Sequence, residues 1–257
     1  MVQFLLPKES QVRPGERYPV SGKGPFKWFH IYRYDPDILD NPRMDSYPVS
    51  LDHPMILDGL LTIKHKIDGA LAFRHSCREG ICGSCAMNIN GVNTLACITP
   101  LTSYKGDIVI YPLPHMRMIK DLVADLTHAF QQYAESRPWL RSSKPISVYK
   151  ERLQSPEERR ALDGLWECIL CFCCTTSCPS YWWNPDVYLG PATLLQARRW
   201  IVDSRDDATQ ERLTDLDDAF KLYRCHTILN CVKSCPKKLN PAQAIAGIKR
   251  DLLKRQL

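Results

Sequence analysis

The spacing of the cysteines constrains this chain more than any other feature. The 257 residues include 12 cysteines, most of them in two short runs. The segment from Met1 to Tyr18 lacks an apolar signal core, and Glu9 and Glu16 do not fit a transit peptide. This favours a reducing compartment such as the bacterial cytoplasm, where cysteines are metal ligands more often than disulfides. The sequence therefore predicts metal centres.

The first run has the spacing C-x4-C-x2-C with a further cysteine downstream, which is the pattern of a plant-type 2Fe-2S site. Gly80 and Gly83 allow the loop backbone to wrap closely around a cluster. Structural zinc also takes four thiolates, but it prefers paired C-x2-4-C spacing. We therefore interpret this run as 2Fe-2S ligands: Cys77, Cys82, Cys85 and Cys97.

The second run has the spacing C-x2-C-x2-C-x3-C-P of bacterial ferredoxins, in which the fourth cysteine serves the other cluster. It consists of Cys168, Cys171, Cys174 and Cys178. A downstream run repeats the template with Cys225, Cys231 and Cys235, but Ile228 stands at its second cysteine position. One thiolate is therefore missing.

The pairing rule of these ferredoxins predicts two ligand sets. The 4Fe-4S set is Cys168, Cys171, Cys174 and Cys235, and the remaining set is Cys178, Cys225 and Cys231. Three thiolates suit a 3Fe-4S cluster, since isoleucine cannot ligate iron, although water or an external ligand could complete a fourth corner. Cys173 is surplus to the template, and we interpret it as a small buried hydrophobe.

Residue patterns outside the cysteines differ between the two halves of the chain. Residues 1–27 are rich in Pro, Gly and Lys and are expected to form an extended N-terminal arm. Residues 28–116 show period-two alternation and predict a small sheet with one helix. The predicted strands are 28–33, 47–51, 86–89, 92–95 and 107–111, with a hairpin at Asn90-Gly91, and the predicted helix is 55–67.

The second half predicts helices. From Ile119 the apolar residues follow helical spacing, which predicts a long amphipathic helix within a linker of residues 117–145. Residues 146–257 are expected to form an all-helical domain. Its helix signals are the capping box of Ser155 and Glu158, the starts at Gly190-Pro191 and Asn240-Pro241, and the apolar series Leu216, Ala219, Phe220 and Tyr223.

Composition excludes several classes of function. The net charge of +6 comes from scattered basic residues, and neither a basic stripe nor a nucleic-acid module is visible. The longest apolar stretch, Leu165 to Cys174, is interrupted by Glu167 and is far shorter than the roughly 18 residues of a membrane-spanning helix. We therefore expect neither nucleic-acid binding nor a membrane span.

The combination of these two cysteine domains, with one cysteine missing, resembles the iron-sulfur subunit of succinate dehydrogenase, respiratory complex II. The resemblance covers residues 28–257 and is strongest in segments 76–88, 178–185 and 224–226. It implies an α+β fold: an N-terminal β-grasp plant-type 2Fe-2S ferredoxin domain followed by an all-helical bacterial-type two-cluster ferredoxin domain.

The resemblance implies an electron-transfer subunit of succinate:quinone oxidoreductase. Electrons from succinate would leave the FAD of a flavoprotein partner and pass through the 2Fe-2S, 4Fe-4S and 3Fe-4S clusters to ubiquinone, with no residue for succinate oxidation on this chain. The absence of a G-x-G-x-x-G motif agrees with a flavin on another polypeptide. Haem-containing membrane-anchor subunits would hold the chain on the cytoplasmic face of the bacterial inner membrane, or on the matrix face of the mitochondrial one.

The resemblance also implies quinone-site residues: Pro179, Ser180, Trp182, Trp183, His226 and Ile228. Trp183 and His226 are the strongest candidates, because an indole N–H can donate to a quinone carbonyl and a histidine beside Cys225 can supply protons. The alternative is that the aromatic residues only exclude water and that His226 is structural.

Two other functions remain open at this point. Fumarate reductase uses the same parts with reversed electron flow, and cysteine spacing does not establish direction, although residues 171–174 and the Trp182-Trp183 pair resemble the succinate-oxidising form. A scaffold with cysteine-bound zinc belongs to a different class and would give a colourless protein.

Overall fold

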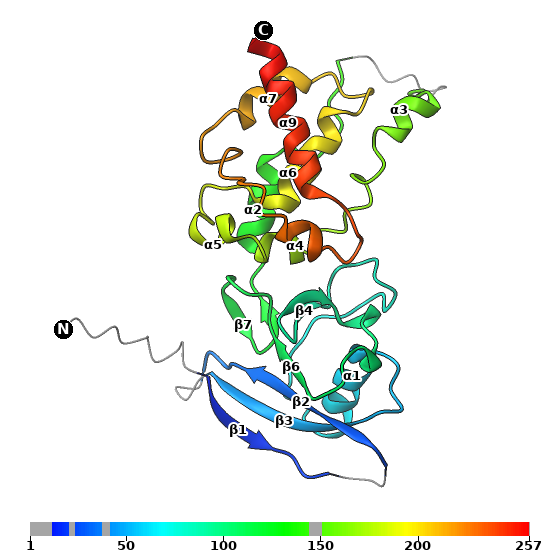
Figure 1. The fold of residues 1–257 in the computed structure, drawn as a ribbon, viewed down its shortest axis with the longest axis vertical. Helices are drawn as coiled ribbons and strands as arrows, with labels where there is room; N and C mark the ends of the chain where they lie inside the picture. Colours follow the sequence, from blue (N-terminus) through cyan, green and yellow to red (C-terminus); the bar gives the residue numbers. More distant parts are fainter. Residues whose placement is uncertain (1–11, 21–23, 38–41, 144–150, 257) are drawn as a thin grey trace, which may run out of the picture. The chain divides into compact units, whose positions relative to one another are not determined.

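The computed structural model describes residues 12–20, 24–37, 42–143 and 151–256. The chain divides into two compact units, Met1–Asp125 and Leu126–Leu257 (Figure 1). The first contains a sheet and the second is helical, so the predicted α+β class is confirmed. The division falls inside residues 117–145, where we expected a linker. Residues 1–11 and 21–23 of the predicted arm, 144–145 of the predicted linker and 146–150 of the predicted helical domain lie outside the described residues.

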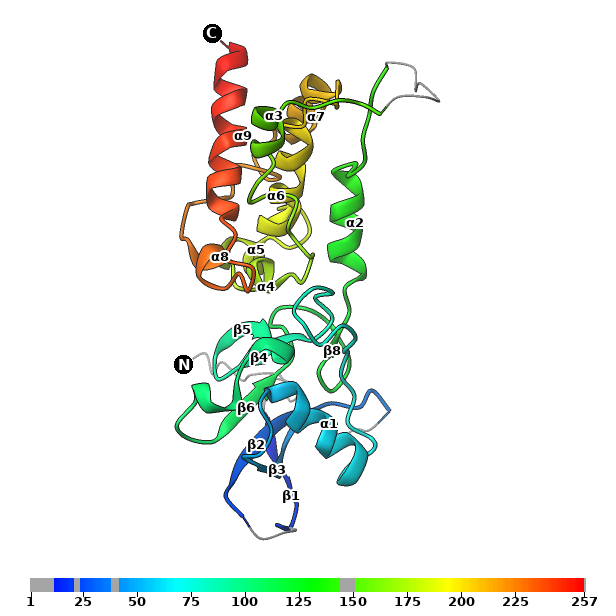
Figure 2. The same cartoon turned by 90° about the vertical axis from the view of Figure 1, so that its right-hand side faces the viewer.

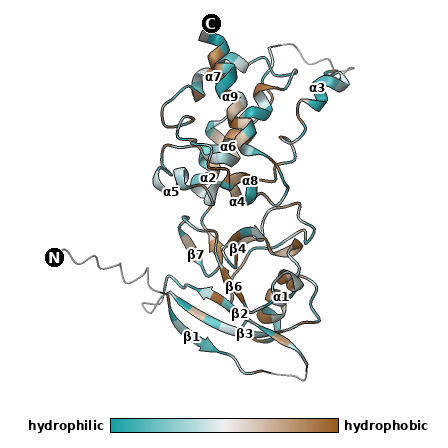
Figure 3. Cartoon of the chain, viewed as in Figure 1, coloured by the Kyte–Doolittle hydropathy of each residue, from teal (hydrophilic) through white to brown (hydrophobic). Residues whose placement is uncertain are grey.

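The first unit is built on a six-stranded sheet with the order β1-β3-β2-β6-β4-β5. Its strands are β1 (Arg13–Arg17), β2 (Phe26–Arg33), β3 (Arg43–Ser50), β4 (Ala86–Ile89), β5 (Val92–Leu95) and β6 (Ile108–Tyr111). The predicted N-terminal arm contributes β1, which pairs in parallel with β3 at the edge of the sheet. All five β1 residues are exposed, and the strand is largely hydrophilic (Figure 3).

One face of β2 and β3 forms the core of this unit. These strands pair antiparallel, and alternate residues such as Phe29 and Tyr47 are fully buried. Helix α1 (Ile56–Lys66) packs against them through Gly59, where an added Cβ would lie 2.9 Å from the Phe29 ring. The predicted helix and strands are thus confirmed, although β3 starts earlier than the predicted residue 47.

The predicted Asn90-Gly91 hairpin is also confirmed. β4 and β5 pair antiparallel, and both turn residues have positive φ, 47° at Asn90 and 85° at Gly91. This is the combination that a two-residue hairpin turn requires. The 3₁₀ turn η2 (Ala96–Ile98) follows β5 directly and carries Cys97, and a second 3₁₀ turn, η3 (Leu101–Ser103), leads towards β6.

The long helix predicted from Ile119 is wrong in its first part. The chain instead forms a short hairpin of β7 (Met118–Lys120) and β8 (Val123–Ala124). Asp121 in its turn is 1% exposed and accepts hydrogen bonds from Arg33 Nε at 3.0 Å and from the Ala72 amide at 2.8 Å. These long-range bonds outweigh the helical spacing of the apolar residues, because tertiary contacts override local propensity.

The second unit is helical. Its helices are α2 (Thr127–Glu135), α3 (Pro156–Arg160), α4 (Cys173–Thr176), α5 (Pro179–Trp183), α6 (Gly190–Ile201), α7 (Thr209–Leu216), α8 (Asn230–Lys233) and α9 (Pro241–Gln256). Helices α6 and α9 lie side by side in both views (Figures 1 and 2) and share a core that includes Leu194, Ile245 and Ile248. Within the part of the chain that the structure describes, no helix is long and apolar enough to cross a membrane.

The predicted helix starts are confirmed, but one helix was misplaced. Ser155 Oγ accepts from the Glu158 amide at 3.2 Å, and the Glu158 carboxylate accepts from the Ser155 amide at 2.7 Å, which completes the predicted capping box of α3. The apolar series from Leu216 to Tyr223 does not form a helix. Helix α7 ends at Leu216, because Asp218 accepts the amides of Phe220 and Lys221 and turns the chain.

Helix α2 belongs to the second unit rather than forming a free connection. Gln132, only 4% exposed, donates to the carbonyl oxygens of Pro185 at 2.7 Å and Tyr188 at 3.2 Å. Its side-chain oxygen accepts from the Tyr181 hydroxyl at 3.0 Å. These bonds hold α2 against α5, which carries four of the predicted quinone-site residues, and against the segment between α5 and α6.

Candidate metal centres

The first cysteine loop folds its backbone amides towards sulfur. Cys77 Sγ accepts from the amides of Ile81 and Cys82 at 3.2 Å and from that of Glu79 at 3.5 Å. The wrapping requires positive φ at Arg78 and at the predicted Gly80, where φ is 74°. The hydrogen bond from Glu79, followed by those from Cys82 and Ile81, lowers the pKa of Cys77 to about 6. The loop is therefore shaped to hold a thiolate.

The other three thiols of this group differ in exposure, and only Cys82 is exposed. Cys82 Sγ accepts from the Ser84 hydroxyl at 3.0 Å, while Cys85 and Cys97 are buried. Burial raises the pKa of Cys85 to about 12, and the thiols of Cys97 and Cys82 add to the shift because they lie close to it. A sulfur with so high a pKa becomes a thiolate at neutral pH only when a metal replaces its proton. The arrangement fits a cluster that binds all four sulfurs.

The two later cysteine runs repeat one backbone conformation at an offset of 57 residues. Positive φ occurs at Leu170 and again at Thr227, and at Phe172 and again at Leu229. The short helices α4 and α8 follow at equivalent positions and contact each other. The Ser177 and Ser234 hydroxyls, 57 residues apart, meet at 2.7 Å. In this repeat Ile228 occupies the position of Cys171.

Cys235 of the downstream run lies with the first three cysteines of the upstream run. Burial is the main reason that the pKa of Cys168 is raised, and the nearby thiols of Cys171 and Cys235 raise it further. The pKa of Cys174 is also raised, first by burial and then by the thiols of Cys171, Cys168 and Cys235, with a smaller effect of Cys231. Cys235 Sγ accepts from the Leu239 amide at 3.3 Å. The structure thus brings together the four thiols of the predicted 4Fe-4S set.

The remaining three cysteines line one cavity in the second unit. Its volume is about 320 Å³ when the solvent at its opening is included. Burial raises the pKa of Cys231 to about 11, and the thiols of Cys178 and Cys225 add to this. The lining contains several predicted quinone-site residues, namely Pro179, Ser180, His226 and Ile228. Ile228 is 48% exposed, so a partly exposed apolar side chain stands where the other run has Cys171.

Cys173 lies beside the four-thiol group and is fully buried. A hydrogen bond with Cys171, together with burial, raises the pKa of the Cys173 thiol well above its usual value. All twelve cysteines are free of disulfides. Among the described residues, no group of three or more His, Cys, Asp or Glu side chains is arranged around a single metal ion. Ligands of a multi-iron cluster bind different irons and therefore surround a larger volume.

The two candidate tryptophans, Trp182 and Trp183, have different environments. Trp182 Nε1 donates to the carbonyl oxygen of Thr176 at 2.7 Å, so its N–H is already engaged within the fold. Trp183 is 82% exposed at the end of α5. His226 is exposed, and Ser180 is 8% exposed. Neither tryptophan lines the three-thiol cavity.

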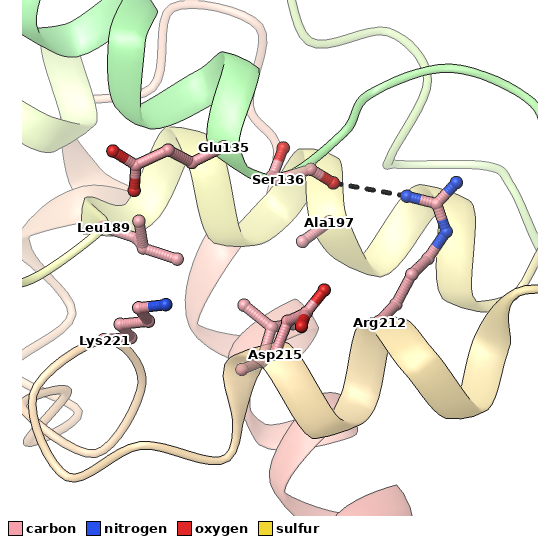
Figure 4. A pocket seen from close by; sticks show the side chains of 8 residues that line it. Glu135, Ser136, Leu189, Ala197, Arg212, Asp215 and Lys221 are labelled. Carbon is pink, nitrogen blue, oxygen red and sulfur yellow. Dashed lines mark hydrogen bonds between the residues drawn. The ribbon is translucent and has the colours of Figure 1, made fainter.

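A second hollow of this unit lies between α2, α6 and α7 (Figure 4). Its lining contains no cysteine and no predicted site residue. Arg212 projects beside it and donates to the Ser136 carbonyl oxygen at 3.2 Å, to that of Arg137 at 2.7 Å and to Asp206. This buried arginine ties the end of α2 to α7, so the hollow is a packing feature.

Two family models match the chain in the regions of these thiol groups. Residues 28–131 match a 2Fe-2S iron-sulfur cluster binding domain, and residues 167–240 match a 4Fe-4S dicluster domain. The chain is 58% identical over 258 residues to the succinate dehydrogenase iron-sulfur subunit of Paracoccus denitrificans, covering 99% of both proteins. The chain belongs to the succinate dehydrogenase iron-sulfur subunit family. Members of this family are subunits of an oxidoreductase, and the two iron-sulfur domains give this chain an electron-transfer role.

Solved structures share the fold of this succinate dehydrogenase family member. A chain of the Mycobacterium smegmatis Sdh1 complex in the apo form has a TM-score of 0.81 at 22% identity, covering 91% of this chain and 98% of that one. A hypothetical protein from Helicobacter pylori has a TM-score of 0.54 at 15% identity, covering 90% of this chain and 40% of that one. Both comparisons support the order of a sheet domain followed by a helical domain.

Sequence reasoning missed two features around the thiols. One is the Ser177–Ser234 contact, although a serine before the Cys-Pro of each run was a visible signal. The other is Tyr188, a fully buried residue that lines the three-thiol cavity. Tyr188 stands outside both cysteine runs, and only the fold brings it to them.

Proposed function

We propose that this chain relays electrons within a succinate dehydrogenase complex, from the FAD of a flavoprotein partner to ubiquinone. The 2Fe-2S ligands are Cys77, Cys82, Cys85 and Cys97. The 4Fe-4S ligands are Cys168, Cys171, Cys174 and Cys235. The 3Fe-4S ligands are Cys178, Cys225 and Cys231. Bound clusters supply one-electron carriers, and the protein supplies their sulfur ligands, hydrogen bonds and shielding from water.

The observation that carries this proposal is the three-thiol cavity with Ile228 in its lining. The two cysteine runs repeat the same backbone conformation, so the position of Ile228 is a ligand position with the ligand removed. A zinc scaffold would have no use for such an incomplete set, because structural zinc sites take four ligands. The family membership supports the same conclusion.

We place the quinone beside this cavity. Ile228 lines the cavity and is 48% exposed, and Trp183, in the helix that begins with the lining residues Pro179 and Ser180, is 82% exposed, so both offer apolar surface to a quinone. Trp183 is the candidate donor to a quinone carbonyl, and exposed His226, adjacent to Cys225, is the candidate proton donor. Pro179 and Ser180 line the cavity, whereas Trp182 positions α5 through its bond to Thr176.

The quinone would be presented by membrane-anchor subunits, which we expect to contain haem. The chain would then sit peripherally on the cytoplasmic face of a bacterial inner membrane, or on the matrix face of a mitochondrial one. A close homologue in Paracoccus denitrificans supports the bacterial location.

Metal analysis with low-temperature electron paramagnetic resonance of the intact complex tests the proposal. We expect iron and acid-labile sulfide for three clusters, a three-iron signal in the oxidised complex and a two-iron signal after reduction by succinate. A colourless, zinc-containing, resonance-silent protein would refute it. Assays in both directions with ubiquinone and menaquinone analogues test the direction, and turnover only with menaquinol and fumarate would indicate fumarate reductase instead.

A further inference from the structure

Tyr188 is a buried polar residue that the assignments above leave unexplained. Its side chain is fully buried, yet among the described residues its hydroxyl has no hydrogen-bond partner. Buried hydroxyls in folded proteins nearly always have a partner, because an unmet one loses its bonds to water without replacement. A hydroxyl left in this state points to an acceptor within the cavity that Tyr188 lines.

The surroundings of this hydroxyl identify the missing partner. Tyr188 lines the same cavity as Cys178, Cys225 and Cys231. Burial raises the pKa of its phenol, and the nearby thiols of these three cysteines raise it further. The backbone of Tyr188 is fixed by two hydrogen bonds. Its amide donates to the Asn184 carbonyl oxygen at 2.9 Å, and its carbonyl oxygen accepts from Gln132. The backbone therefore holds the ring against the thiols.

We propose that the Tyr188 hydroxyl donates a hydrogen bond to sulfur at the three-iron site and thereby raises the reduction potential of that cluster. This inference rests on the ligand set in the proposed function. A reduced cluster carries one more negative charge than an oxidised cluster, so a donor to sulfur stabilises the reduced form more. Hydrogen bonds to sulfur are among the factors that set iron-sulfur potentials. Tyr188 is thus a positioning and tuning residue for the last electron carrier.

Tyr181 provides a matched control. It is also buried, at 2% exposure, and its ring centroid lies 6.5 Å from that of Tyr188. Its hydroxyl, however, donates to Gln132 Oε1 at 3.0 Å and so already has a partner. A Tyr→Phe change at either position removes one buried oxygen, but only the change at residue 188 should remove a donor to sulfur.

The test is a redox titration of Tyr188→Phe and Tyr181→Phe in the intact complex, following the oxidised three-iron resonance. We expect Tyr188→Phe to disfavour reduction by a few-fold to tenfold, tenfold being 59 mV for a one-electron couple, and Tyr181→Phe to leave the potential unchanged. An unchanged potential in Tyr188→Phe with an intact three-iron signal would overturn the inference, as would equal shifts in both variants.

Electron–nuclear double resonance of the three-iron cluster gives a second readout, which detects protons close to the cluster and does not require a reduction potential. The wild-type complex should show an exchangeable proton coupled to the three-iron cluster, which disappears in D₂O. This coupling should persist in Tyr181→Phe and be lost in Tyr188→Phe. Persistence in Tyr188→Phe would assign the proton to water or another donor and reject our inference. A wild-type complex without any three-iron signal would instead refute the proposed function.

Discussion

The Ser177 and Ser234 hydroxyls lie 2.7 Å apart, and each serine immediately precedes the last cysteine of its run. Each hydroxyl also lies within hydrogen-bond distance of a carbonyl oxygen in its own run, Ser177 Oγ at 3.0 Å from that of Cys174 and Ser234 Oγ at 2.9 Å from that of Asn230. Because a hydroxyl has one proton, one serine donates to the other, and the serine that accepts donates to its own carbonyl oxygen. The pair therefore joins the two runs directly before Cys178 and Cys235, the cysteines that we propose bind the cluster of the other run.

We expect Ser177→Ala and Ser234→Ala each to lower the activation free energy of cluster loss by ~1 kcal/mol. The double variant should lower it by less than the sum of the two, because both single changes remove the same shared bond. Rates of loss of the four-iron and three-iron signals on heating measure this. Ser136 is a matched control, since its hydroxyl donates to the Tyr133 carbonyl oxygen at 2.7 Å and so makes a similar local bond. Ser136→Ala should be additive with Ser234→Ala; equal coupling in both cycles would show that the cross-run contact has no special role.

Ile228→Cys should convert the three-iron cluster into a four-iron cluster. Ile228 occupies the ligand position in the repeated backbone conformation and lines the three-thiol cavity, so a thiolate there can bind a fourth iron. Loss of the oxidised three-iron resonance, with about one additional iron per complex, would be the expected result. Ile228→Val, which adds no ligand, should retain the three-iron signal. A three-iron spectrum at full occupancy in Ile228→Cys would contradict the ligand pairing.

Trp183→Ala should impair quinone reduction while leaving the fold intact. The side chain is 82% exposed, so its removal should change stability by no more than about 0.5 kcal/mol. Loss of a donor to the quinone should lower succinate-to-ubiquinone turnover by about tenfold or more, the scale of one well-placed hydrogen bond. Turnover with an acceptor that takes electrons directly from the flavin should not change. Trp139 is 52% exposed and lies outside α5, the helix whose Pro179 and Ser180 line the three-thiol cavity, so Trp139→Ala should keep full quinone activity.

Arg33→Met should destabilise the first unit strongly. Its side chain is 5% exposed and pairs with Asp45 at 3.1 Å and Asp121 at 3.0 Å, both of which are buried, and it also contacts Asp68. Removing the cation leaves buried carboxylates without compensation, an effect worth about 3–5 kcal/mol. The measurement is the rate at which the two-iron signal is lost in urea.

Arg43→Met is the control for this prediction. Arg43 also pairs with Asp45, at 3.0 Å, but its side chain is 31% exposed. Partly exposed ion pairs contribute about 0–1 kcal/mol, so the two-iron signal should be lost at nearly the normal rate. If the two-iron signal were lost equally fast in both variants, burial of the Arg33 ion pairs would not add to the stability of the first unit.

Local signals in the sequence predicted much of the secondary structure. Asn90-Gly91 specified a hairpin because both residues tolerate positive φ, and the capping box of Ser155 and Glu158 specified the start of α3. The errors occurred where distant partners compete with local preference. The segment after Ile119 has helical spacing, yet Arg33 holds Asp121 in a hairpin turn, and Asp218 ends the apolar series that follows α7.

The sequence by itself determined which sulfurs are available and in what spacing, because the number of residues between cysteines limits how a loop can surround a cluster. It also determined that one run lacks a thiolate, since Ile228 has no ligand atom. Only the tertiary structure decided which thiols share a cavity, that Trp182 is engaged while Trp183 is exposed, and that the buried side chain of Tyr188 lines the three-thiol cavity. These relationships join residues far apart in the chain, and burial and hydrogen bonding between distant segments are properties of the packed fold.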